Sequence, residues 1–473
     1  MAQRTLPQIA GDVWGAFRGN RQMRRRYDAA RLVSDRNARF TTYAGEVPAA
    51  AGLIRTRSRY YGENNPYFAA AIRTLAKDLV GAEIVPGSTH PDPATQKLLA
   101  DAWAKFSAAA DFDRLTTLGG LEAALVTDMA RDGEGLAIMR NTPDGLRIQR
   151  LAPEMLDDSK SCDLGGGAFV QNGVEFDSTG RRAAYWIFRE APANAFAAHI
   201  QSERVTAEDV LHLFDPRGPG QCRGLPWGAA AIKRMGEIDQ LEDALLVGNK
   251  VAAMLCGVVT DEFASGTAPF DGDQNGSTLT GSLEPGTLLN LGAGKKVTFS
   301  TPAQSAQGVE FLASQLRAVA SAFGVPPHCV DSDYSRANYS SLRASLVTYA
   351  GRLDQIVHTI IRPQLLDRIW RRWITTEVLR GAIESPDFES NPEPWLAVEW
   401  FPPAPPVADE IKAAQADALQ IANGLKSRSQ AIRERGYAPE ALDAERAADA
   451  ERAKALGLDA PASPHDKESE DAE

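Results

Sequence analysis

The chain has 473 residues, and because single hydrophobic cores rarely grow beyond about 250 to 300 residues, we expect several folding units. Hydrophobic residues make up 44% and charged residues 24% of the chain, which excludes wholesale disorder. The net charge of −11 argues against a protein that holds nucleic acid tightly, since such proteins neutralise phosphates with Lys and Arg. The sequence contains no apolar run near the ~20 residues that span a bilayer and no signal-peptide pattern, so we expect it to be made and used in a cytoplasm.

The two ends of the chain differ from the rest in charge. Residues 1–40 contain nine Arg and three Asp, whereas the last nine residues contain five acids, and both ends are predicted to be solvated arms. The cysteines are widely spaced and form no C-x-x-C pair, so we expect free thiols, mostly buried, and no zinc site: Cys162, Cys222, Cys256 and Cys329.

The first half of the chain is predicted to be helical and then rich in short strands. Apolar residues at helical spacing predict helices at Pro66–Val80, Ala94–Ser107 and Leu118–Asp132. Gly81 and Gly133 follow the first and third of these helices as stop signals. Short β-prone runs divided by turn residues then predict a compact antiparallel sheet flanked by helices: Leu136–Arg140, Leu146–Leu151, Gly173–Phe176, Ala184–Phe188 and Val210–Phe214.

The second half is dominated by long helices. A helix from Trp227 to about Leu255 precedes a small β-rich insertion at 256–308 and a second helix at Val309–Phe323. A third helix runs from Leu342 to about Gly381 and contains Pro363, which can kink it. After a proline-rich linker, helices are predicted at Ala408–Asn423 and Ala438–Ala455. The fold class is therefore α+β, mostly helical, with a small antiparallel sheet and a β-containing insertion.

No motif for catalysis, metal binding or a cofactor is convincing. Asp271, Asp273 and Asn275-Gly276 imitate the start of a calcium loop, but the twelfth position is Ser282, which favours an ordinary polar loop. Gly294-Lys295-Lys296 lacks the first Gly and the Ser or Thr of a phosphate-binding loop. The histidines form no H-E-x-x-H pair, and there is no G-x-S-x-G turn. We expect no enzyme and no cofactor, and the alternative is a soluble hydrolase or nucleic-acid-modifying enzyme whose site assembles only in three dimensions.

Residues 210–228 carry a more specific pattern. Val210–Arg217, followed by Gly220, Gln221, Arg223, Gly224, Pro226 and Trp227, resembles a signature of the lambda-type phage portal proteins. Further segments resemble that family in order and spacing: Gly324–Pro327, the run Asn338, Tyr339, Ser340, Ser341, Leu342 and Arg343, and Asn423–Arg428 with Glu434–Gly436. Pro327 departs from the family, in which an aromatic residue is common there, and the loop at 261–282 is unlike it. Taken alone, Gly220–Trp227 also fits a loop that packs Trp227 on a core.

The resemblance, which covers roughly residues 20–450, implies a ring of usually twelve subunits. It implies a basic N-terminal arm at 1–40, a wing at 41–225, stem helices at 226–255 and 309–324, a clip at 256–308 and a tunnel loop at 325–340. It also implies a long wing helix that returns to the sheet at 341–400, and a crown with an acidic tail at 401–473. The alternative within phage biology is a minor head or adaptor protein.

The same resemblance implies the partners. A channel of net negative or mixed charge lets double-stranded DNA slide, and the expected DNA-facing tunnel-loop residues are Asp331, Asp333, Tyr334, Ser335, Arg336 and Asn338. This segment has almost nothing to bury, so we expect it to be exposed. The clip, with Asp271, Asp273, Lys295 and Lys296, is expected to dock the large terminase subunit and the head-tail adaptor. Other expected contacts are with identical subunits and with the major capsid and scaffold proteins, at the portal vertex of a virion assembled in the host cytoplasm.

Overall fold

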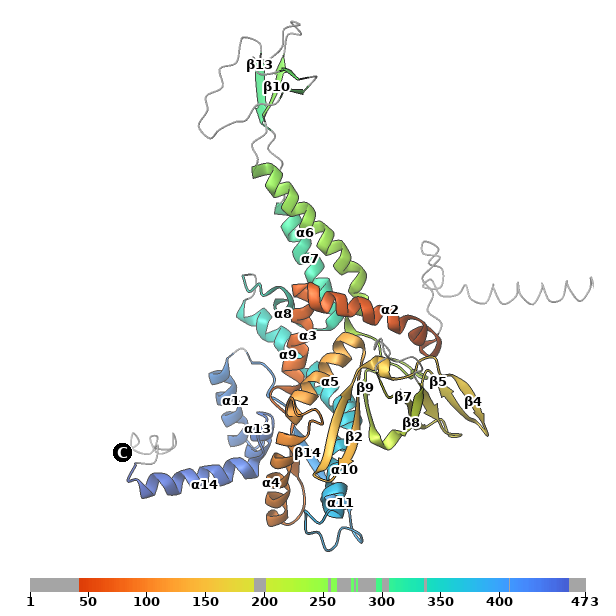
Figure 1. Ribbon diagram of the computed structural model, residues 1–473. Helices are drawn as coiled ribbons and strands as arrows, with labels where there is room; N and C mark the ends of the chain where they lie inside the picture. The colour runs from red at the N-terminus through yellow and green to blue at the C-terminus, as the bar shows by residue number, and fades with distance from the viewer. Residues whose placement is uncertain are drawn as a thin grey trace, which may run out of the picture.

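The structure is a computed structural model, and it describes residues 42–190, 201–253, 257–261, 274–275, 278–279, 295–299, 306–335, 338–407 and 409–458. Figure 1 shows a body of helices and sheets from which two helices, α6 and α7, project together. A small group of strands lies at the far end of this helix pair. The confirmed fold class is α+β, mostly helical with small antiparallel sheets.

Four helices open the described chain: α2 (Tyr43–Asn64), α3 (Pro66–Val80), α4 (Pro93–Ala109) and α5 (Leu118–Asp132). Helices α3 and α5 have the predicted bounds, because each combines an N-cap side chain with a glycine stop. Asn65 accepts a hydrogen bond from the Phe68 amide at the start of α3, and Gly81 ends that helix at φ 61°. Helix α2 was not predicted from the sequence, since it contains Pro48 and lacks a clear apolar stripe.

The strands of the body form two sheets where the sequence predicted one. The three-stranded sheet has the order β3-β2-β9, formed by β2 (Glu134–Thr142), β3 (Gly145–Leu151) and β9 (Val210–Phe214). The five-stranded sheet comprises β4 (Cys162–Gly165), β5 (Ala168–Gln171), β6 (Val174–Phe176), β7 (Arg182–Phe188) and β8 (Ser202–Thr206). The expectation of a single sheet was wrong because β6 and β7 pair with the unpredicted β5 and β8, and not with β2 or β3.

The projecting pair consists of α6 (Ile232–Ala253) and α7 (Ala306–Phe323). Helix α6 begins later than predicted, because Trp227–Ala230 forms a short 3₁₀ turn, η4, after Pro226. Beyond the pair, β10 (Gly257–Asp261) pairs with β13 (Lys295–Phe299), and β11 (Gln274–Asn275) pairs with β12 (Thr278–Leu279), both antiparallel. The sequence order of helix, β insertion and helix is thus present in the structure.

After the short helix α8 (His328–Asp331), one long helical rod crosses the body. It consists of α9 (Tyr339–Ile356), a π-helical segment η5 (Val357–Leu366) and α10 (Asp367–Leu379). The sequence predicted a kink at Pro363, and the chain instead widens into a π-helix there. The rod is followed by α11 (Glu393–Leu396) and β14 (Val398–Phe401), which pairs with β1 (Val85–Ser88).

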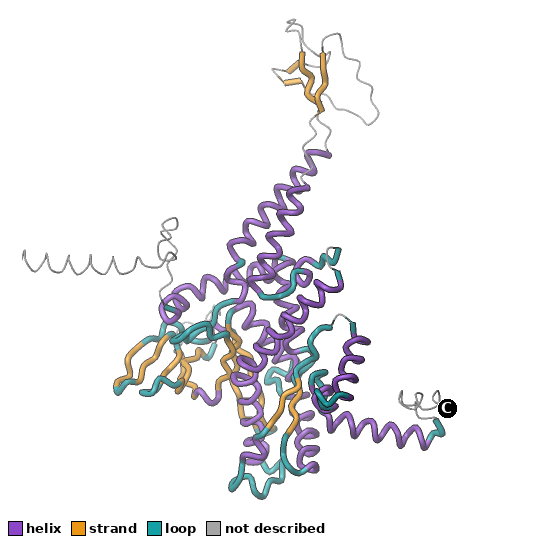
Figure 2. Tube along the Cα trace, turned by 180° about the vertical axis from the view of Figure 1, so that it is seen from behind, coloured by secondary structure: helices purple, strands orange, loops and turns teal. Residues whose placement is uncertain are grey.

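The C-terminal region is helical. It contains α12 (Glu410–Ala422), α13 (Arg428–Arg433) and α14 (Pro439–Ala455), of which α13 was not predicted. In Figures 1 and 2, α14 points away from the body. The remaining short elements are the 3₁₀ turns η2 (Pro153–Met155) and η3 (Ala207–Asp209).

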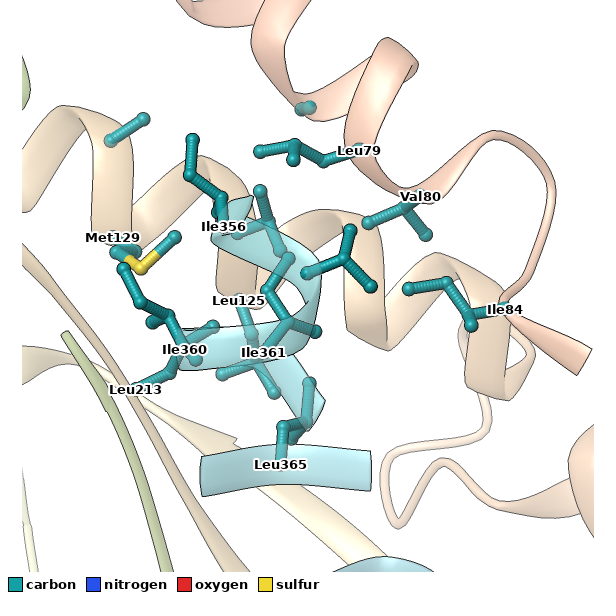
Figure 3. Packing of buried hydrophobic residues seen from close by; sticks show 14 of the residues in the cluster. Leu79, Val80, Ile84, Leu125, Met129, Leu213, Ile356, Ile360, Ile361 and Leu365 are labelled. Carbon is teal, nitrogen blue, oxygen red and sulfur yellow. The ribbon is translucent and has the colours of Figure 1, made fainter. Parts of the chain in front are cut away.

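The main hydrophobic core surrounds the rod. Figure 3 shows Ile356, Ile360, Ile361 and Leu365 of the rod packed among side chains of α3, α5 and β9. The rings of Trp103, Trp370, Trp373 and Trp400 extend this core toward β1 and β14. A second, smaller core includes Leu136 of the three-stranded sheet and Tyr185 and Ile187 of the five-stranded sheet. The rod therefore connects the helical part of the body to the sheets.

Candidate functional site

The predicted signature lies where β9 leads into the projecting helices, and we call residues 215–226 the junction. All residues from Gln221 to Gly228 are buried, and Trp227 is 5% exposed within the main core. The Gln221 amide organises the loop, because its Nε2 donates to the backbone oxygens of Asp215 and Arg223, while its Oε1 accepts from the Arg217 amide. Gln221–Trp227 therefore form a buried structural connection, as the core-packing interpretation expected, whereas Pro216, Arg217 and Gly220 of the motif are exposed.

A buried carboxylate fixes the junction to β2. Glu134, the first residue of β2, is 1% exposed and accepts hydrogen bonds from Arg223 Nε at 2.9 Å, from Arg55 Nη2 at 2.6 Å and from the Gly224 amide at 3.0 Å. His212 Nε2 lies 3.0 Å from Oε2, the same oxygen that accepts from the Gly224 amide, whereas these two arginine contacts are to Oε1. Four contacts from three separate segments thus converge on one side chain.

The charges in this cluster are held in defined states. Burial alone would raise the pKa of Glu134, but the Arg223 charge and the hydrogen bonds from His212 and Arg223 hold its pKa well below the usual range. Burial lowers the pKa of His212 to about 4, although Glu134 opposes the shift. Glu134 is therefore ionised and His212 neutral at pH 7, and the two arginines carry the positive charge of the cluster.

Two glycines let the backbones at this site approach closely. A Cβ on Gly224 would lie 2.0 Å from the carbonyl oxygen of Gly133, and a Cβ on Gly133 would lie 2.6 Å from the Leu225 carbonyl carbon. Gly133 also has φ +94°, in the left-handed region that side chains disfavour. The turn between α5 and β2 is consequently in backbone contact with the junction.

A second ionic group attaches α2 to the same region. Asp132, 1% exposed, accepts from Arg59 Nη2 at 2.8 Å and from Arg131 Nε at 2.9 Å. Burial opposes the ionisation of Asp132, but the hydrogen bonds from Arg59 and Arg131 lower its pKa. Asp128, one turn earlier, forms a bidentate pair with Arg150. These residues were not predicted from the sequence, in which the one signal for them is a set of charged residues around the start of an otherwise apolar strand.

The residues predicted to form a tunnel loop divide into a buried and an exposed part. The expectation that residues 325–340 bury almost nothing is wrong for the first part, because Val325 and Val330 are 6% and 3% exposed and pack in the main core with α8. Asp331 is half-buried at the end of α8, whereas Asp333, Tyr334 and Ser335 are exposed. Arg336 lies outside the described residues.

The second family segment begins α9. The Asn338 side chain accepts from the Ser341 amide at 2.8 Å, and the Ser341 hydroxyl accepts from the Asn338 amide at 3.2 Å. This reciprocal capping box explains why Asn and Ser stand three residues apart. Tyr339, Ser340 and Arg343 are exposed on the first turns.

The residues predicted to form a clip are less fully described. Asp271 and Asp273 lie outside the described residues, while Lys295 and Lys296 begin β13 opposite Asp261 and Thr260 of β10. Of the predicted clip residues, the two that the structure describes, Lys295 and Lys296, thus belong to a different element from the described tunnel-loop candidates, which lie in and after α8.

Two grooves flank Lys233 near the base of the helix pair. One, of about 700 Å³, lies between α6 and α7 and is lined by Ile238, Leu241 and Phe311 among others. The other, of about 460 Å³, lies between α2 and the start of α6 and includes Tyr60. Large apolar side chains along the pair are more than half exposed: Leu246, Val247, Val309 and Phe311.

Other expectations concern thiols, metals and membranes. Cys222 is buried, but Cys162 is exposed and Cys329 is half-buried, so the expectation of mostly buried thiols was wrong for the described cysteines. Within the described ranges, no group of three or more His, Cys, Asp or Glu side chains is arranged to hold a metal ion. Over the same part of the chain, no helix is long and apolar enough to cross a bilayer.

Comparison with known proteins places the chain in a family. The family described as "Phage portal protein, lambda family" matches residues 30–356. The "Probable portal protein" of Halomonas phage phiHAP-1 is 24% identical over 437 residues, covering 86% of this chain and 82% of that protein. "Portal protein B" of Escherichia phage lambda is 21% identical over 356 residues, covering 66% of this chain and 62% of that protein.

Solved structures with similar chains include the "Neck of native GTA particle computed with C12 symmetry", with a TM-score of 0.46 and 16% identity over 82% of this chain and 92% of that chain. A HK97 family phage portal protein from Corynebacterium diphtheriae gives a TM-score of 0.28 and 11% identity over 76% of this chain and 95% of that chain. The family match covers more than half of the sequence, from before α2 to the end of α9. This chain belongs to the lambda family of phage portal proteins.

Proposed function

We propose that the chain forms a ring of about twelve subunits at one capsid vertex, and that DNA enters and leaves the head through the channel of this ring. The observation that carries the proposal is the exposure of apolar side chains on the helix pair: Phe311 is 56%, Val309 63% and Leu246 52% exposed. Exposed apolar patches of this kind mark protein-protein interfaces. The family consists of structural portal proteins, and this supports a portal in preference to a hydrolase or an adaptor.

The partner that fits the grooves is a second copy of the chain. The groove between α6 and α7 and the exposed apolar residues of α7 belong to one helix pair. A neighbouring subunit placed by rotation can therefore present its exposed apolar side chains to this groove of the next subunit. Such a head-to-tail contact closes into a ring when the rotation divides a full turn evenly. Burial of these side chains at ~25 cal/mol per Å² favours the closed assembly.

The proposal assigns each part of the chain to one region of a portal subunit. The wing is 41–225, with 341–400 returning to it, and the stem is 226–255 and 309–324. The clip is 256–308, the tunnel loop is 325–340, and the crown and its acidic tail are 401–473. The buried junction supports this division, because Glu134, Arg223 and Gly224 connect the wing rigidly to the base of the stem.

The channel conducts DNA without gripping it. The net charge of −11 disfavours persistent contact with phosphates, and the exposed tunnel-loop residues Asp333, Tyr334 and Ser335 combine negative and polar groups. Arg336 and Asn338 complete the predicted DNA-facing set. At the other end of the stem, the clip with Asp271, Asp273, Lys295 and Lys296 docks the large terminase subunit and then the head-tail adaptor.

The ring is assembled in the host cytoplasm with the major capsid and scaffold proteins and becomes part of the virion. Its work requires neither a cofactor nor a membrane. Energy for packaging comes from the terminase, since the chain carries no complete phosphate-binding loop.

Phe311→Glu tests the ring contact. A charge at this position cannot be buried cheaply, so we expect the variant to remain folded but to form at least about ten-fold fewer rings by native mass spectrometry. Leu379→Glu is the matched control, because Leu379 is 82% exposed at the end of α10, far from the grooves. Normal ring formation by Phe311→Glu, or equal loss in both variants, would show that the helix pair is not the interface.

A further inference from the structure

The C-terminal helices expose apolar side chains that their own subunit does not cover. No residue of α12 is buried, and in α14 Pro439 alone is buried. Isolated helices of about 12 to 15 residues are marginally stable in water, so a helix as short as α12, with 13 residues, depends on packing of its apolar face. The large apolar side chains of this region that are more than half exposed are Val407, Ile411, Leu419, Leu425, Tyr437, Leu456 and Leu458. These side chains require a covering surface.

Helix α12 presents an apolar face to solvent. Exposed apolar residues recur every three or four positions and therefore share one side of the helix: Ile411, Ala414, Ala418 and Ala422. Leu419, 67% exposed, borders this side. At the end of the helix Gly424 has φ +70°, and the Leu425 amide donates to the Gln420 carbonyl oxygen at 2.9 Å, which fixes the position of Leu425. We call Ile411, Leu419 and Leu425, with the alanines between them, the α12 face.

Helix α14 carries apolar residues at its far end. With 17 residues it is about 25 Å long. Gly457 has φ +66°, and the Leu458 amide donates to the Ala453 carbonyl oxygen at 2.9 Å, which is the same geometry as at the end of α12. Leu456 is 66% and Leu458 62% exposed. We call α14 with Leu456 and Leu458 the arm, and its end is a hydrogen-bonded apolar surface.

The arm does not meet the α12 face within one subunit, because the leucines of both are exposed. Lys412 Nζ lies 4.7 Å from the centre of the Tyr339 ring, and Arg433 pairs with Glu399 at 3.2 Å, so α12 and α13 are attached to the body. In Figures 1 and 2 the arm instead points away from the body, across the direction of the projecting pair α6 and α7. The surface that covers the end of the arm therefore lies outside its own subunit.

The residues that follow the arm are unsuited to cover either surface. Residues 459–473 contain six acids, one Lys and no Leu, Ile, Val, Met, Phe, Tyr or Trp. Such a segment has no large apolar side chains with which to remove the exposed leucines from water. A second copy of the chain, by contrast, brings both an arm and an α12 face, and each can cover the other.

We propose that the arm of each subunit packs against the α12 face of the next subunit, with Leu456 and Leu458 covering Ile411, Leu419 and Leu425. The partner is a second copy of this chain, and the contact is head-to-tail, so it repeats around a ring. This inference rests on the proposed ring, but it concerns a surface apart from the groove between α6 and α7. The arms join neighbouring subunits through their C-terminal helices.

The double variant Leu456→Glu/Leu458→Glu tests the arm in rings of the full-length chain. The contact of α6 and α7 is unchanged, so we expect rings to form, but amides of residues 411–422 should exchange at least about ten-fold faster than in wild-type rings. Lys454→Glu is the control, because it makes the same change in net charge on the opposite side of α14, and it should leave this exchange within about two-fold of wild type. Unchanged exchange in rings of the leucine variant would overturn the proposal and indicate that residues 1–41 or another surface covers α12.

Mixed rings test whether the two surfaces belong to different subunits, and they do not depend on the leucine variant. One chain carries Leu456→Cys and the other carries a cysteine in the α12 face, in a background with Cys162→Ser, Cys256→Ser and Cys329→Ser. The three variants of the α12 face are Ile411→Cys, Leu419→Cys and Leu425→Cys. A disulfide requires Cα atoms within about 7 Å, so we expect at least one combination to give at least about ten-fold more mixed dimer on a non-reducing gel than Lys454→Cys gives. Rings without such dimers would overturn the arm contact and leave the ring standing, whereas wild-type monomers in native mass spectrometry would remove both.

Discussion

Arg223 and Glu134, separated by 88 intervening positions, form a fully buried ion pair, with Arg223 Nε 2.9 Å from one oxygen of Glu134 and 3.0 Å from the other. The pair joins the loop that enters the helix pair to the first residue of β2. Since Arg55 and the Gly224 amide donate to the same carboxylate, α2, β2 and the junction meet at one point.

Arg223→Met should therefore be strongly destabilising. Removing one partner of a buried ion pair leaves the other charge insufficiently compensated, and such losses are typically about 3–5 kcal/mol. We expect a decrease of this size in the free energy of unfolding from urea titration. Arg428→Met is the control, since Arg428 pairs with Asp443 on the surface, and its unfolding midpoint should be unchanged. Equal midpoints for both variants would contradict a central role for the buried pair.

Gly324→Ala should destabilise the connection between α7 and α8. Gly324 has φ +68°, and a Cβ there would lie 2.2 Å from the Arg352 guanidinium, which itself lies over the Trp227 ring. We expect a loss of about 1–2 kcal/mol in the free energy of unfolding. Gly351→Ala, in the middle of α9 with open space around it, should instead gain about 0.5–1 kcal/mol. The explanation fails if the two substitutions change stability in the same direction.

How far the sequence predicts this fold depends on whether the signal is local. The bounds of α3 and α5 follow from caps and glycine stops close to each helix end, and β9 follows from its apolar run. Helix α2 lacks a local signal, because it is stabilised by Arg55 and Arg59 reaching carboxylates more than 70 positions away. Strands β5 and β8 are short, and β8 is largely exposed, so the division into two sheets could not be predicted from the sequence.

The contacts of the candidate site also lack a local signal in the sequence. The family signature marks the junction in the sequence, but it gives no indication that Arg223 is buried against Glu134 or that Gly224 contacts Gly133. At Pro363 the sequence indicates a disturbed helix, whereas the choice of a π-helix over a kink depends on the core that must be filled on both sides. Long-range packing decides each of these features.

Glu122→Gln should change the dependence of stability on pH. Glu122 is 1% exposed; one oxygen accepts from the Ile84 amide at 3.0 Å, and the other is buried without a hydrogen bond. Burial raises the pKa of Glu122 well above its usual value, so the folded state binds the proton more tightly than the unfolded state.

The stability that the raised pKa of Glu122 contributes is fully present below the pKa of the unfolded state, about 4.3. It is lost as the pH rises toward the pKa of the folded state. The urea midpoint of Glu122→Gln relative to that of the wild type should therefore be higher at pH 8 than at pH 5. Glu440→Gln, on the exposed surface of α14, serves as the control. A difference between Glu122→Gln and wild type that stays constant from pH 5 to pH 8 would show that Glu122 is not titrating.

The tunnel-loop assignment predicts accessibility from the channel. In a background with Cys162→Ser, Cys256→Ser and Cys329→Ser, Tyr334→Cys should react with a maleimide in the assembled ring, because Tyr334 is 58% exposed, whereas Val319→Cys, fully buried in α7, should not. Replacing Asp331–Asn338 by a Gly-Ser linker should preserve assembly but lower the yield of full-length packaged genomes. Protection of Tyr334→Cys in the ring, or normal packaging by the linker variant, would remove the assignment.

The mass of the purified assembly shows whether the chain forms a ring. Native mass spectrometry of the full-length chain at micromolar concentration gives the number of identical subunits in the assembly, and images of the same sample show whether these subunits form a ring. We expect a closed ring of about twelve chains with a central channel. A monodisperse monomer without rings would contradict this expectation.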